Sequence, residues 1–149
     1  MTYSNTDLMR FLDAQNKLYL TALSEIKNGK KETHWMWFIF PQLRGLGTSD
    51  NANYYGIEDV QEASGFLTHP ILGKHLIEIS GALLAAFKRN PEEAVMNDLD
   101  RKKLHSSMTL FSLIENTHPI FQEVLEVLFK GKLDPLTIAI ITQTKEAGV

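Results

Sequence analysis

The sequence contains no cysteine in its 149 residues. Without cysteine the chain has no disulfide framework, no thiolate metal site and no cysteine nucleophile. It also lacks an excess of basic residues, because 15 Lys and Arg stand against 18 Asp and Glu and give a net charge of −3. Since phosphate contacts dominate the affinity for nucleic acid, this balance predicts no nucleic-acid partner.

Long apolar runs are missing as well. None approaches the ~20 residues that a helix needs to cross a bilayer. The N-terminal segment MTYSNTDLMRF has neither the basic start nor the apolar run of a signal peptide. We therefore expect a cytoplasmic protein with no membrane partner, and the length predicts one domain over residues 1–149.

Familiar catalytic and cofactor signatures are also absent. The chain has no GxGxxG or Walker A loop, and no HExxH, CxxC or GxSxG motif. The GLG at residues 45–47 is too short to indicate a phosphate cradle and is interpreted as a turn. His69 and His75 are six residues apart, which is poor spacing for metal ligands on a helix. We therefore expect no cofactor and no metal.

Most of the chain shows apolar residues at three- and four-residue steps, which is typical of amphipathic helices. We predict an all-α fold, a single compact orthogonal bundle of about six or seven helices, with a frayed tail over about residues 143–149. An α+β fold with two short strands is the alternative. It arises because the aromatic run at residues 34–40 and LTIAIIT at residues 136–142 also suit strands.

Smaller signals interrupt these helical patterns. Gln15 lies on an apolar stripe, so we expect a core amide bonded to a backbone carbonyl, because an unpaired buried amide costs roughly 1–3 kcal/mol. Gly81 lies inside a helical segment and predicts a close helix contact. THPIL at residues 68–72 and THPIF at residues 117–121 are interpreted as one helix-start device used twice.

The most unusual segment is HWMWFIFPQ at residues 34–42, which holds four of the chain's 14 aromatic residues and both tryptophans. A helix over residues 34–40 is favoured, because Thr33 can cap its start and Pro41 forces Phe40 out of the α region. Core packing is the simpler interpretation of this run. The alternative is a cleft in which Trp37 offers a stacking surface for a flat ring.

Polar residues near this run favour the cleft. Gln42 and Arg44 follow it directly, and an amide and a guanidinium suit a nucleotide-like ligand. Ser107 lies between Leu104 and Phe111 on the apolar side of a later helix. We therefore predict a small-molecule site for a planar or nucleotide-like ligand, lined by His34, Trp37, Gln42, Tyr55 and Ser107.

Two other functions stay open. One is a protein-interaction module without a pocket, which an exposed apolar patch would favour. The other is an acid–base enzyme that acts on a glycosidic or ADP-ribosyl bond. In that case the His34 imidazole would transfer the proton, and the carboxylate of Asp100 or Glu62 would orient the imidazole.

Four motifs make the chain similar to a known family: HWMWFIFPQ, GLGTSDNANYY, EASGFLTHPILG and DRKKLHSSMTLF. Over about residues 11–137 the chain resembles the uncharacterised bacterial family catalogued as domain of unknown function 1810. Members are sometimes labelled calpastatin, and nothing in this sequence supports that label. The resemblance implies a small, soluble, all-helical protein, and it implies no activity. The chain departs from the family pattern at Phe66, His75 and Asn97, and the loss of an arginine at position 75 weakens a phosphate-binding role there.

Overall fold

The computed structural model describes residues 5–91 and 95–147. Within these ranges the chain forms eight helices and no strand, apart from a single parallel bridge between Leu43 and Ile57. The predicted all-α fold is confirmed, and the α+β alternative is wrong. The helices are α1 (Asn5–Lys27), α2 (Met36–Ile39), α3 (Asp50–Tyr55), α4 (Val60–Thr68), α5 (Leu72–Arg89), α6 (Asp98–Ser112), α7 (Ile120–Phe129) and α8 (Pro135–Ala147).

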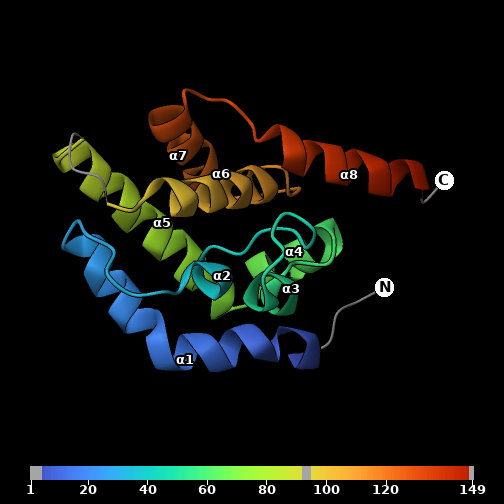
Figure 1. Ribbon diagram of the computed structural model, residues 1–149, viewed down its shortest axis with the longest axis horizontal. Coiled ribbons are helices and arrows are strands. Elements are labelled where there is room, and N and C mark those ends of the chain that lie inside the picture. The colour runs from blue at the N-terminus through green and yellow to red at the C-terminus, as the bar shows by residue number, and fades with distance from the viewer. Residues whose placement is uncertain (1–4, 92–94, 148–149) are drawn as a thin grey trace.

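Helix α5 runs through the middle of the bundle, between α1 on one side and α6 and α7 on the other (Figure 1). It packs against α1, α4 and α7, while α6 packs against α7 and α8. The centre of the core is aromatic. The largest fully buried side chains there are Trp35, Phe11, Phe40, Phe66, Phe111 and Phe121.

The two Thr-His-Pro-Ile segments begin α5 and α7 with the same histidine contact. Nδ1 of His69 accepts a hydrogen bond from the backbone N–H of Ile71 at 3.1 Å. Nδ1 of His118 accepts one from the N–H of Ile120 at 3.0 Å. The prediction of one device used twice is confirmed, and both imidazoles have a structural role at a helix start.

Helix α8 shows why LTIAIIT is not a strand. Oδ2 of Asp134 accepts hydrogen bonds from the backbone N–H of Thr137 at 3.1 Å and from its Oγ1 at 2.6 Å. This cap and Pro135 outweigh the strand propensity of the β-branched residues. The backbone of α8 is helical to Ala147, although the sequence predicts a frayed tail from about residue 143. Residues 148–149 lie outside the described residues.

The helix of the aromatic run is shorter than predicted. It covers only Met36–Ile39 instead of residues 34–40, and its N-cap is Trp35, with no side-chain capping bond. Thr33 does not cap it, because its hydroxyl donates to Oε2 of Glu25 at 2.6 Å. Phe40 leaves the α region before the proline, as predicted, with φ −120° and ψ 72°.

The close helix contact predicted at Gly81 is wrong, and another glycine of α5 makes one. A Cβ on Gly81 would meet no atom within 4 Å outside the backbone of its own turn. A Cβ on Gly73 would lie 1.9 Å from the carbonyl oxygen of Leu67. Glycine at position 73 therefore lets the start of α5 pass against the end of α4.

Among the described residues no single helix is long and apolar enough to cross a bilayer. Helices α4 and α5 meet that test only when taken together, and they are bent by 86° relative to each other.

Candidate functional site

Most of the aromatic run belongs to the core. Trp35 is completely buried, and its indole N–H donates to Oε1 of Glu25 at 2.9 Å. Met36, Phe38 and Phe40 are buried as well. The core interpretation therefore holds for this part of the run.

Glu25 anchors the entry to α2. Its carboxylate accepts four hydrogen bonds, from the backbone N–H groups of Glu32 and Thr33, from the Thr33 hydroxyl and from the Trp35 indole. Burial opposes the charged form, but the bonds from Thr33, Glu32 and Trp35 outweigh it and lower the pKa of the Glu25 carboxyl to about 2. Glu25 is therefore an ionised structural anchor at neutral pH.

Trp37 is the half-buried member of the run and lines a small hollow. The Lys103 ammonium lies 4.9 Å from the centre of its ring, so a cation already covers one aromatic face. The volume is only about 10 Å³, which is enough for about one water molecule. This Trp37 hollow is lined by Met36, Trp37, Phe40, Gln42, Ala52, Tyr55, Gly56 and Lys103.

The structure brings three of the five predicted site residues together. Trp37, Gln42 and Tyr55 all line the Trp37 hollow. His34 is exposed and does not line it. Ser107 is completely buried, and its hydroxyl has no hydrogen-bond partner among the described residues.

A larger space opens beside the hollow, between the 42–47 segment, α6 and the start of α8. Its volume is about 420 Å³, and it shares Gln42 and Lys103 with the Trp37 hollow. Leu99 and Leu136 are 64% and 65% exposed and stand at its rim. This α6–α8 cleft is lined by Gln42, Leu46, Gly47, Leu99, Lys102, Lys103, His105, Ser106, Asp134 and Leu136.

The charges of the cleft favour an anion. Lys102 and Lys103 line the cleft with one carboxylate, Asp134, while the Lys103 ammonium also lies 3.9 Å from Oδ1 of Asp100. Oδ2 of Asp134 already accepts from Ser106 Oγ at 3.0 Å and from the N–H and hydroxyl of Thr137. The N-terminus of α8 adds a partial positive charge at the same place.

His105 is held in a fixed position on the cleft wall. Its Nε2 lies 2.7 Å from the carbonyl oxygen of Lys132, so this nitrogen carries the proton and donates. The ring stacks on Phe129 at 4.2 Å between centres. His105 and Ser106 both line the cleft, but the serine bonds directly to Asp134 and not through an imidazole. This arrangement does not form a Ser-His-Asp triad.

The acid–base hypothesis requires a carboxylate beside His34, and both candidates are engaged elsewhere. Oδ2 of Asp100 pairs with the Lys31 ammonium at 3.0 Å. Glu62 pairs with Arg10 at 2.9 Å. No hydrogen bond joins His34 to either carboxylate in the described part of the chain.

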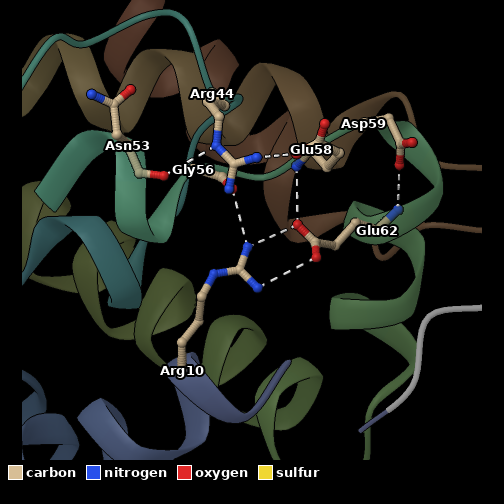
Figure 2. A network of polar contacts seen from close by, with 7 residues as sticks. All are labelled: Arg10, Arg44, Asn53, Gly56, Glu58, Asp59 and Glu62. Carbon is tan, nitrogen blue, oxygen red and sulfur yellow. Dashed lines mark hydrogen bonds and ion pairs between the residues drawn. The ribbon is translucent and has the colours of Figure 1, made fainter. Parts of the chain in front are cut away.

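Figure 2 shows the polar network that contains Glu62. Arg10 of α1 donates through both terminal nitrogens to the Glu62 carboxylate and through Nη2 to the carbonyl of Gly56 at 3.0 Å. Oε1 of Glu62 also accepts from the backbone N–H of Glu58 at 3.0 Å, and Glu58 pairs with Arg44. The network ties residues 44–58 to α1 and α4, and so fixes the segment that carries one wall of the cleft.

A second space lies beside Leu43, between the start of α4 and helix α8. Its volume is about 200 Å³, and its apolar lining comes from Leu43, Val60, Ile140 and Ile141. Glu58, Asp59 and Gln61 form its polar edge. We call it the α8 cavity.

The sequence pattern missed most of the cleft. Of the residues that line it, the sequence pattern points only to Gln42 as a site residue. The signal that could have marked them is the density of polar groups in DRKKLHSS, although nothing in that string shows which loop faces it. In the part of the chain that the structure describes, no group of three His, Asp or Glu residues could hold a metal ion.

Comparisons with known proteins agree with the fold. A family model described as a protein of unknown function (DUF1810) matches residues 5–141. The crystal structure of the conserved hypothetical protein Rv1873 from Mycobacterium tuberculosis is 40% identical and superposes with a TM-score of 0.87. The match covers 93% of this chain and 99% of that one. The comparison with curated proteins gave no match.

Proposed function

Because the chain belongs to the DUF1810 family, described only as proteins of unknown function, we propose a function from the cleft itself: it binds a small planar or nucleotide-like ligand. One observation carries the proposal. A space of about 420 Å³ joins a polar floor to two leucines that are otherwise left in water. Ligand sites of this kind span roughly 300–1,000 Å³ and combine apolar walls with a few convergent polar groups.

Each wall has a distinct role in this proposal. The Gln42 amide both donates and accepts, so it suits the edge of a heterocycle. Lys102 and Lys103 attract an acidic group such as a phosphate. Leu99 and Leu136 would cover the faces of a flat ring and become buried. Of the five residues predicted for the site, only Gln42 lines the cleft. The other four have no part in the proposal: His34, Trp37, Tyr55 and Ser107.

A thermal-shift screen of nucleotides, ADP-ribose and sugar phosphates tests the proposal. A ligand at 100 times its Kd adds ~2.7 kcal/mol to the free energy of unfolding. For a chain of this size the midpoint should rise by roughly 5–10 °C. The shift should shrink strongly in Gln42→Ala and Lys102→Ala and persist in the matched surface variant His34→Ala. No shift with any compound, or equal shifts in all four proteins, would contradict a ligand site in the cleft.

The exposed leucines also suit a protein-interaction module. Leu99 and Leu136 would then be covered by a partner and not by a small molecule. The two functions differ in one result. A protein partner would lose affinity in Leu99→Ala and Leu136→Ala, while the ligand screen would show no shift.

A further inference from the structure

The α6–α8 cleft and the α8 cavity lie along one seam. The 42–47 segment forms one side of both spaces, through Gln42 and Leu46 at the cleft and through Leu43 at the cavity. Helix α8 forms the other side, through Leu136 at the cleft and Ile140 at the cavity. A helix rises 1.5 Å per residue, so these two lining positions are only ~6 Å apart along α8.

The 42–47 segment comes close to α8 at Gly45. A Cβ built on Gly45 would lie 3.9 Å from Cδ1 of Ile140, which lines the α8 cavity. Gly45 has φ +102°, a conformation that disfavours any side chain here. Residue 45 therefore places no side chain against α8 here, and the isoleucine tip faces bare backbone.

The chemistry of the seam changes along its length. The cleft end carries Lys102, Lys103 and Gln42. The cavity end is apolar, and its carboxylates are engaged, because Glu58 pairs with Arg44 and Asp59 accepts from the Glu62 N–H at 2.8 Å. A dry apolar space of about 150 Å³ can hold a benzene ring, so about 200 Å³ is enough for a group of about six carbons.

We propose that the ligand of the cleft is amphipathic: its acidic head lies at Lys102 and Lys103, and its apolar chain runs along α8 into the α8 cavity. This inference rests on the proposed function and adds the class of ligand, a phosphate monoester or a carboxylic acid with a short alkyl or aryl tail. The acidic head would occupy the part of the cleft next to the two lysines, and the tail would displace the Ile140 side chain.

A series of alkyl monophosphates, from ethyl to dodecyl, tests this by calorimetric titration below the micellar concentration. The Kd should fall by up to about fourfold per methylene once the chain has passed the ~6 Å between the two lining positions, and the fall should stop when about six carbons fill the cavity. Adsorption to the general surface would give no such limit.

Two substitutions that fill the cavity separate the tail from the head. Val60→Phe and Ile141→Trp should flatten the dependence on chain length and leave the Kd of ethyl phosphate unchanged. Val127→Phe on α7, at a residue 39% exposed, is the matched control and should keep the dependence. Circular dichroism checks that each variant is folded.

The outcomes distinguish the two proposals. If ethyl phosphate or a nucleotide binds but chain length has no effect, the amphipathic ligand is ruled out and the cleft keeps its proposed function. If the Kd still depends on chain length in both Val60→Phe and Ile141→Trp, the α8 cavity is ruled out as the site of the tail. If neither the phosphates nor the nucleotides bind the native protein, both proposals fail.

Discussion

Replacing Glu25 with glutamine removes a charge that four hydrogen-bond donors surround. Oε1 accepts three of these bonds, so a glutamine oxygen in the same place can keep them in weaker, neutral form. The amide nitrogen would then face the Thr33 hydroxyl, which can accept. We expect Glu25→Gln to fold but to lose between about 1 and 3 kcal/mol of unfolding free energy at pH 7.

The same carboxylate makes stability depend on pH. The pKa of Glu25 falls from 4.5 to about 2 on folding, so the folded state holds this proton less tightly than the unfolded state. The resulting contribution of Glu25 to the free energy of unfolding is complete above about pH 4.5 and disappears as the pH falls towards 2. Its full size is roughly 3 kcal/mol at most, and about 2 kcal/mol of it is lost by pH 3.

Urea unfolding at pH 7, 5, 4 and 3 measures both effects. The native protein and the exposed control Glu32→Gln should lose this stability below pH 4.5, while Glu25→Gln should show a flatter profile. Parallel profiles for all three proteins would refute the assignment of the low pKa to Glu25. A loss below about 0.5 kcal/mol at pH 7 would show that the four bonds do not hold the entry to α2.

Three further substitutions test the packing by the same urea assay. Gly81→Ala should raise the free energy of unfolding by about 0.5–1 kcal/mol, because the helix gains propensity and the added methyl meets open space. Gly73→Ala should lower it by more than about 2 kcal/mol, because the Cβ would lie 1.9 Å from the carbonyl oxygen of Leu67; an unchanged midpoint would show that α4 and α5 can separate there. Ser107→Ala should raise it by up to about 1 kcal/mol, because it removes a buried hydroxyl for which the described part of the chain offers no partner; a clear loss would reveal a bound water or other acceptor.

The helices could be predicted from the sequence because their signals are local. Asp59 and the two Thr-His-Pro-Ile segments act on backbone groups within three residues of themselves. Gln15 is a longer-range success. Its Nε2 donates to the carbonyl of Phe38 at 2.8 Å, as expected for an amide on an apolar stripe.

The failures have a common physical cause, which is competition from distant groups. Thr33 has the right residue type and position for a cap, but its hydroxyl donates its hydrogen bond to the Glu25 carboxylate instead. The cleft combines Gln42, Lys103 and Asp134, which belong to three segments far apart in the chain. Periodicity shows that each segment is helical or looped, but it carries no information about which segments face one another. The predicted ligand itself stays a prediction.

Helix α8 depends on a narrow set of neighbours, since it packs chiefly against α6 while α5 packs against three helices. Elements with few tertiary contacts open at a lower free energy than the rest of a protein, so their amides should exchange with deuterium first. The cleft and the α8 cavity both have α8 as a wall, so local unfolding of this helix would dismantle both spaces while the aromatic core stayed folded. A ligand bound along the seam would add contacts to α8. The tighter it binds, the more slowly the backbone amides of α8 should exchange with deuterium.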